Sequence, residues 1–187
     1  AGGLTHASQW RLTTGFDGDA APIATNLEEV DAPLGFGVLG SSMTEASGIF
    51  TFPSTGYWLI HFHASFTTTS NNQWYLGWIY TTTDNSTYAQ ASELNQTAQL
   101  ATASAIYPSG DCFYIFDVTS TSTHKARLSF TPVDENISIY PVPGPSAVTS
   151  AFSVSGFNDQ YIFYGFLTKK ENELEKILKK LCNLDYS

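Results

Sequence analysis

Short runs of strand-forming residues alternate with turn-rich clusters along most of this chain. The runs are rich in aromatic, Val, Ile and Thr residues, which favour strands, and clusters such as residues 53–56, 70–72, 108–111 and 141–145 separate them. No ten-residue helical period interrupts the runs up to residue 167, so strand–helix–strand units are not expected. The pattern predicts an all-β sandwich or barrel, with strands at residues 10–13, 35–39, 48–52, 58–67, 74–82, 99–107, 112–118, 126–132, 137–140, 150–155 and 160–167.

Two of these runs are apolar on both faces. Residues 58–62 (WLIHF) and 161–167 (YIFYGFL) do not alternate apolar with polar side chains. A strand with one wet face should alternate, because successive side chains point to opposite faces. Each strand therefore needs cover on both sides, from a second sheet on one side and from another subunit on the other. A strand enclosed in a large monomeric barrel is the alternative.

The pattern changes after residue 167, which divides the chain into a β-body at residues 1–167 and a tail at residues 168–187. Thr168 and Glu171 fit a capping box. A short amphipathic α-helix is predicted, because apolar residues follow at heptad spacing. Its stripe could pack between copies of the chain, on its own β-body or in a partner's groove. The residues of this stripe are Leu174, Ile177, Leu178, Leu181 and Leu184.

The segment SGIFTFPSTGYWLIHF at residues 47–62 resembles the signature of the C1q domain. That signature reads small-Gly-x-Phe, then five residues, then Gly-x-aromatic-x-apolar-x-aromatic, and every spacing matches. We expect Phe50 and Phe52 on one face of a strand, a turn at residues 53–56, and Trp58, Ile60 and Phe62 on one face of the next strand.

The run at residues 161–167 looks like the closing strand of the same family. The resemblance implies a ten-stranded C1q/TNF-like jelly roll that assembles as a homotrimer about a threefold axis, with both two-sided strands at the subunit interface. Met43 departs from the family pattern, and the middle of the chain matches only in strand rhythm. The predicted interface residues are Trp58, Leu59, His61, His63, Tyr161, Ile162, Tyr164 and Phe166.

Residues 10–12, 43–48, 83–88 and 117–125 resemble small C1q-like proteins of marine bacteriophages, especially cyanophages. This resemblance implies a virion structural protein, such as a capsid decoration, fibre or tip module used in host attachment. Its partners would be other virion proteins and host-surface glycans. We read no signal peptide at the N-terminus, which agrees with a virion protein assembled in the host cytoplasm. The alternative is a secreted, extracellular C1q-like module that recognises glycans or receptors.

Charge narrows the function further. The net charge is −9, and up to residue 168 the basic residues are Arg11, Lys125 and Arg127. Such a body lacks the basic cluster that a phosphate backbone requires, and an anionic membrane surface would repel it. We therefore expect neither a nucleic-acid partner nor a membrane partner.

Few residues suggest chemistry. His61 and His63 share one strand face and could gather a metal or an anion at a threefold axis, although interface packing is the preferred interpretation. Residues 17–19 and 134–136 are expected to be surface turns, and Cys112 a buried free thiol. The aromatic residues at 74–80 are expected in the core, with stacking on sugars as the alternative. We predict no catalytic residues, no metal and no cofactor; a carbohydrate-active enzyme is a third, weaker hypothesis.

Overall fold

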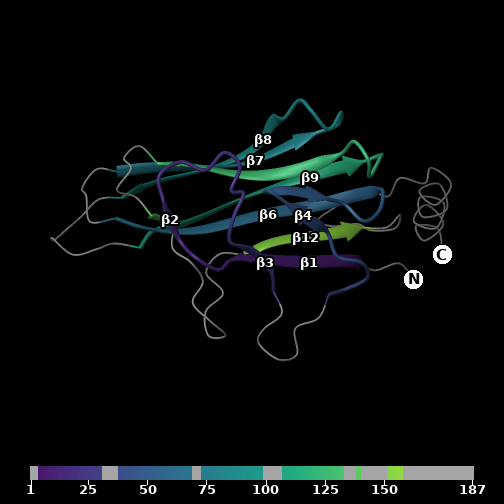
Figure 1. Ribbon diagram of the computed structural model, residues 1–187, viewed down its shortest axis with the longest axis horizontal. Helices are drawn as coiled ribbons and strands as arrows, with labels where there is room; N and C mark the ends of the chain where they lie inside the picture. The colour runs from purple at the N-terminus through teal and green to yellow at the C-terminus, as the bar shows by residue number, and fades with distance from the viewer. Residues whose placement is uncertain are drawn as a thin grey trace, which may run out of the picture.

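The computed structural model describes residues 4–30, 38–68, 73–98, 107–132, 138–139 and 151–157. These residues form strands in two sheets (Figure 1). The strands are β1 (Leu4–Leu12), β2 (Phe16–Asp17), β3 (Leu27–Glu29), β4 (Thr44–Ala46), β5 (Ile49–Thr51), β6 (Gly56–Thr67), β7 (Gln73–Thr82), β8 (Ala89–Ala98), β9 (Ser109–Val118), β10 (Lys125–Pro132), β11 (Ser138–Ile139) and β12 (Ala151–Phe157).

The first sheet is built around β6. One edge of β6 pairs with β9, and the other edge pairs with β12, which in turn pairs with β1 and, through it, with β3. The two-residue strands β2 and β11 extend the sheet beside the last residues of β6. All of these pairs are antiparallel, and Figure 1 shows β1, β12, β6 and β9 side by side.

The second sheet has the order β4-β5-β10-β7-β8, again with antiparallel neighbours. Strands that are adjacent in the chain therefore often lie in different sheets, as β5 and β6 do. Ten of the strands described have three residues or more. The two packed antiparallel sheets confirm the predicted all-β sandwich.

Aromatic side chains from both sheets fill the space between them. Phe66 of β6 lies 4.1 Å from the ring of Tyr75 and 5.1 Å from that of Phe130, measured between centroids. Phe52 packs in the same way on Trp58, at 5.3 Å. Burial raises the pKa of Tyr75 to about 12, because the charged phenolate is poorly solvated there. The alternating burial of β6 confirms that Trp58, Ile60 and Phe62 share one face, and this face points into the core.

The first glycine of the C1q-like signature, Gly48, lies in the turn between β4 and β5. Ser47 and Gly48 both have positive φ, 53° and 80°, as the two central residues of a tight hairpin require. The amide of Gly48 donates a hydrogen bond to Oε1 of Glu45 at 2.5 Å. A Cβ at Gly48 would lie 2.5 Å from the carbonyl oxygen of Ile23, so the position also allows close approach of two backbone segments.

Several strands were missed by the sequence analysis, and the longest is β8. Its sequence AQASELNQTA reads as a loop, because among the described strands β8 pairs only with β7, at the edge of the sheet. Of the β8 side chains whose burial is described, Leu94 is the one buried in the core. The short strands β2, β3 and β4 were missed as well, since two or three residues carry no periodic signal.

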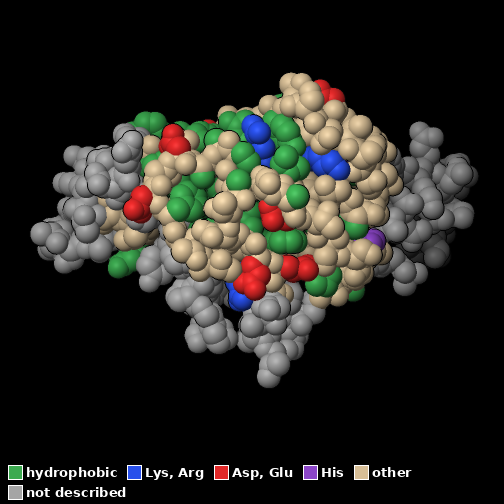
Figure 2. All heavy atoms as spheres, in the orientation of Figure 1, with side chains coloured by type: hydrophobic (Ala, Val, Ile, Leu, Met, Phe, Trp, Pro, Cys, Tyr) green, Lys and Arg blue, Asp and Glu red, His purple; other side chains and the backbone are tan. Residues whose placement is uncertain are grey.

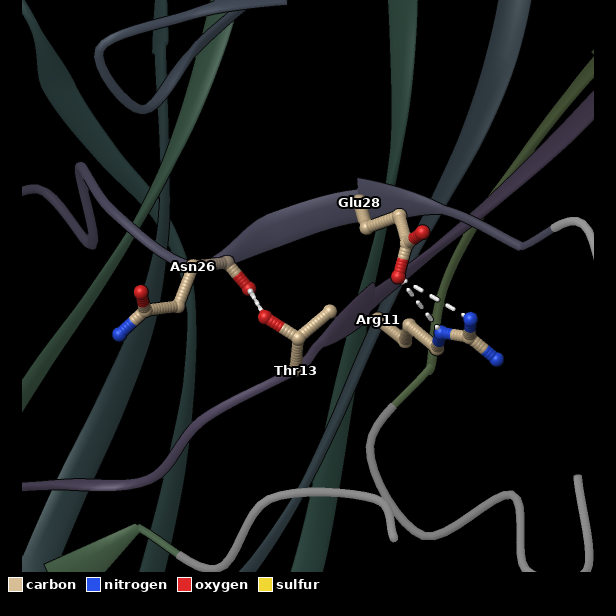
Figure 3. Close-up of polar contacts among 4 residues, drawn as sticks. All are labelled: Arg11, Thr13, Asn26 and Glu28. Carbon is tan, nitrogen blue, oxygen red and sulfur yellow. Dashed lines mark hydrogen bonds and ion pairs between the residues drawn. The ribbon is translucent and has the colours of Figure 1, made fainter. Parts of the chain in front are cut away.

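Strand β3 is held against β1 by a cross-strand ion pair. Arg11 and Glu28 are register partners, and Nη2 and Nε of Arg11 donate to Oε2 of Glu28 at 3.0 and 3.2 Å (Figure 3). Nearby, the Thr13 hydroxyl donates to the carbonyl oxygen of Asn26 at 3.1 Å. These contacts fix the edge of the first sheet.

The hairpin geometry predicts unequal effects for two glycine substitutions. Gly18 has the same φ as Gly48, 80°, but a Cβ there meets nothing within 4 Å. Gly18→Ala should therefore destabilise the protein only by the left-handed backbone cost, about 1–2 kcal/mol. Gly48→Ala should cost clearly more, because two backbone segments must also move apart. Denaturant unfolding measures both, and equal losses for the two variants would contradict the close approach.

Candidate assembly surface

The outward face of β6 carries apolar and imidazole side chains. Trp58, Ile60, Phe62, Ala64 and Phe66 point inward, so the intervening residues face away from the second sheet. The outward row is Tyr57, Leu59, His61, His63, Ser65 and Thr67; Tyr57 is exposed and the others are half-buried. The prediction that residues 58–62 are apolar on both faces is correct for the upstream half of β6, where Tyr57 and Leu59 lie.

Strand β9 adds the most exposed apolar side chains to this face. Phe113 is 65% exposed and Ile115 is 54% exposed, while Tyr114 between them is half-buried and Cys112 and Phe116 on either side are buried. In the register, Ile115 lies opposite Leu59, and Phe113 lies opposite His61. The four residues Tyr57, Leu59, Phe113 and Ile115 therefore form one apolar group, called here the β6–β9 face.

Polar residues border the β6–β9 face at its far end. Nε2 of His61 lies 3.6 Å from Oδ2 of Asp111, and His63 is the register partner of Asp111. Within the part of the chain described, no group of three or more His, Cys, Asp or Glu side chains could hold a metal ion. A metal held by His61 and His63 would therefore need ligands from elsewhere.

The predicted interface residues divide into three groups. Leu59, His61 and His63 lie on the outward face of β6. Trp58 does not: it is 1% exposed, it packs on Phe52 within its own chain, and its Nε1 donates to the carbonyl oxygen of Ser54 at 3.1 Å. Side chains alternate, so Trp58 and Leu59 cannot share a face. Tyr161, Ile162, Tyr164 and Phe166 lie outside the described residues.

The closing position in the first sheet, between β1 and β6, is taken by β12 at Ala151–Phe157. From the sequence, residues 161–167 were expected to close this sheet, and residues 150–155 were predicted as an ordinary strand. The predicted segment at 161–167 lies outside the residues described. The same is true of the predicted tail helix with Leu174, Ile177, Leu178, Leu181 and Leu184, of residues 134–136, and of most of the predicted strands at 35–39 and 99–107.

Strand β9 was predicted, but its part in this face was missed. The run Phe113-Tyr114-Ile115-Phe116 has no polar alternation, which is the same two-sided signal that singled out residues 58–62. The aspartates on either side, Asp111 and Asp117, give the run the look of an ordinary strand with polar ends. Applying the two-sided criterion to every strand would have identified Phe113 and Ile115.

Two smaller predictions can be placed. Asp17 and Asp19 are exposed beside Gly18, as expected of a surface turn. Cys112 is a buried free thiol, as predicted. Over the same described ranges, no helix has the length and apolar character needed to span a membrane.

Solved structures with this architecture belong to the tumour necrosis factor group. The Eiger TNF of S. frugiperda superposes with a TM-score of 0.59 at 10% identity, over 88% of this chain and all of that one. Murine APRIL superposes with a TM-score of 0.57 at 7% identity, over 81% of this chain and 98% of that one. The chain therefore has a C1q/TNF-like jelly-roll fold. At these identities the likeness shows the fold alone.

Sequence comparisons show no family. No family model matches the chain. A 48-residue stretch is 50% identical to ribosomal RNA small subunit methyltransferase I of Thermotoga maritima, which is 25% of this chain and 21% of that protein. The chain thus spans about a fifth of this curated relative, so no activity is carried over from it.

The environment of Cys112 predicts a slow thiol. Burial raises the pKa of Cys112 to about 11, so little thiolate is present at pH 8. The chain has one other cysteine, Cys182, which is replaced by Ser so that Cys112 is followed alone. In this variant, reaction with a disulfide reagent such as DTNB should be about 100-fold slower than for a free cysteine at pH 8. Unfolding in denaturant should restore the ordinary rate. A folded protein that reacts at the free-cysteine rate would show that Cys112 is not in this environment.

Proposed function

We propose that this protein is a non-enzymatic homotrimer that uses its β6–β9 face as the subunit interface and serves as a virion structural module. The observation that carries the self-association is the exposure of Phe113 and Ile115 on the outward face of the first sheet. Exposed apolar groups that lie together mark interaction sites on soluble proteins. Burying one such side chain stabilises an assembly by about 1.5–3 kcal/mol.

A second copy of the same chain is the occupant that the chemistry favours. The face is apolar in its centre and bordered by His61, His63 and Asp111, which resembles the apolar core and polar rim of protein interfaces. A chain of net charge −9 repels its own copies at long range. The centre of this face, at Leu59, Phe113 and Ile115, carries no carboxylate and suits self-association, while Asp111 and Asp117 lie at its two ends. The C1q-like signature at residues 47–62 supports threefold symmetry for this assembly.

The virion role rests on the resemblance of residues 10–12, 43–48, 83–88 and 117–125 to phage C1q-like proteins. In this role the trimer is assembled in the host cytoplasm and contacts other virion proteins and host-surface glycans. A secreted, extracellular recognition module is the alternative. The exposure of Asn85 and Asn95, both in glycosylation sequons, favours that alternative, because acceptor asparagines must be accessible.

Polar substitutions on the β6–β9 face should weaken self-association. The double variant Phe113→Thr, Ile115→Thr keeps β-forming residues but removes the apolar centre. We expect the wild type to have the mass of three chains by analytical ultracentrifugation, and its melting temperature to rise with protein concentration. The double variant should shift towards single chains or lose stability at low concentration.

Trp74→Thr is the matched control, since Trp74 is 44% exposed and lies on β7 of the other sheet. It should leave the mass unchanged. A wild type with the mass of one chain would refute the interface, and so would a double variant that keeps both the wild-type mass and its concentration dependence.

The virion role predicts physical association with particles. Mass spectrometry of purified, nuclease-treated particles from the source should detect the protein at a fixed ratio to the major capsid protein, and immunogold labelling should place it on the particle surface. Recovery of the protein from culture medium, free of particles and glycosylated at Asn85 or Asn95, would instead establish the secreted module.

A further inference from the structure

The outward face of the second sheet carries aromatic side chains that were expected in the core. Along β7 only Tyr75 of the four aromatics at residues 74–80 points into the sandwich, whereas Trp74, Trp78 and Tyr80 face outward. Trp78 and Tyr80 are neighbours, with ring centroids 6.4 Å apart. Figure 2 shows hydrophobic side chains on this side of the molecule, over β7 and β10, with basic side chains among them.

A guanidinium without an acidic partner lies beside these rings. Arg127 of β10 is the register partner of Tyr80, and its Cζ lies 5.2 Å from the ring centroid of Tyr80 and 4.2 Å from that of Tyr88. Neither Arg127 nor Lys125 pairs with a carboxylate of any described residue, in contrast to Arg11, which pairs with Glu28. Two of the three described Lys and Arg side chains therefore lie on one strand without an ion pair to a described carboxylate; Nζ of Lys125 donates to the carbonyl oxygen of Thr121 at 2.8 Å, whereas Arg127 lies against the two rings.

The rings hold Arg127 in a fixed position. Tyr88 follows a turn organised by Asp84, whose Oδ1 accepts hydrogen bonds from the amides of Thr87 and Ser86 at 2.7 and 2.8 Å and from the Thr82 hydroxyl at 2.7 Å. These bonds lower the pKa of Asp84 far below its ordinary range, so it stays ionised and keeps the turn. Nε of Arg127 is buried without a hydrogen-bond partner among the described residues. The planar end of the side chain is thus positioned before any ligand arrives.

A carboxylate acceptor lies on β8, on the opposite side of β7 from Arg127. Its Nε1 donates to Oε2 of Glu93 at 2.9 Å, and Nε2 of Gln90 donates to the same oxygen at 3.1 Å. Glu93 is the register partner of Trp78 and is exposed, so its second carboxylate oxygen can accept from a hydroxyl group. The neighbouring rings of Trp78 and Tyr80 therefore have an acceptor beside one ring and a donor beside the other. The acceptor is Glu93, beside Trp78, and the donor is the guanidinium of Arg127, beside Tyr80.

We infer that this face, formed by Trp78, Tyr80, Tyr88, Glu93 and Arg127, binds an anionic sugar. The apolar C–H side of a pyranose packs on an aromatic plane, its hydroxyls donate to Glu93, and its acid group pairs with the fork of Arg127. A neutral sugar leaves Arg127 unpaired, and a simple anion does not use the rings. The shared chemistry is a pyranose with a carboxylate or a sulfate. The inference rests on the proposed contact with host-surface glycans and names an acidic class of glycan for it, but it does not depend on assembly, because a single chain carries the whole face.

Short oligosaccharides test the site without involving assembly. Titration of the full-length protein with trigalacturonate, followed by tryptophan fluorescence and calorimetry, should show saturable binding. The fully methyl-esterified trisaccharide, which lacks the charge, should bind at least about tenfold more weakly. A sulfated galactan oligosaccharide tests which acid group the site accepts. If it binds and the binding depends on Arg127, sulfate is accepted; if it does not bind, the site is assigned to carboxylates.

Variants assign the binding to the named residues. Arg127→Gln should reduce the affinity for the acid to that for the ester, and Arg127→Lys should recover part of the lost affinity. Trp78→Ala should weaken the binding of acid and ester alike, whereas Trp78→Phe should retain most of the binding. Arg11→Gln makes the same charge change on the first sheet and should have no effect. Equal affinity for acid and ester, full binding by folded Arg127→Gln, or no saturable binding of either acid would overturn the site. None of these outcomes depends on whether the protein is a trimer.

Discussion

The alternation of side chains along β6 governs how this molecule is arranged. One row of β6 reaches into the space between the sheets and meets aromatic rings from β7 and β10. The other row faces outward and still contains Leu59 and Tyr57. A strand of this kind ties two requirements together, because the same backbone that organises the core also presents an apolar surface that water covers poorly. The pairing with β9 enlarges that surface with Phe113 and Ile115.

The two outer faces of the sandwich differ in chemistry, and this difference separates their proposed roles. The β6–β9 face is apolar at its centre, which suits a copy of the same chain. The outward face of β7, β8 and β10 combines aromatic planes with Arg127 as a donor and Glu93 as an acceptor, which suits the inferred anionic sugar. A trimer built through the first face leaves the second face outward on every copy. Three such sites would act together on a long polysaccharide, and their effective affinity would exceed that of one site.

Prediction from the sequence succeeded where burial on one face was strong and failed where it was weak. Strands β6, β7, β9 and β10 were predicted within a few residues, since each contributes several large side chains to the core. Strand β8 was missed because an edge strand buries little and its polar residues carry no period. Trp58 was assigned to the wrong surface because an all-apolar run gives no phase. The same reason explains why Trp74, Trp78 and Tyr80 were assigned to the core. Hydrophobicity indicates that burying a side chain is favourable, but it does not indicate which neighbour buries it.

Local conformational preference and the two-residue period of a strand were enough to predict the all-β class of fold, the turn at residues 53–56 between β5 and β6, and the apolar residues on both faces of β6. Which residues share a surface depends on how the strands pair in three dimensions. Phe113 lies opposite His61, and Arg127 lies opposite Tyr80, only because strands that are far apart in the chain pair in these registers. The ring of Tyr88 also lies against Arg127. Register is a property of two strands together, so no single segment encodes it.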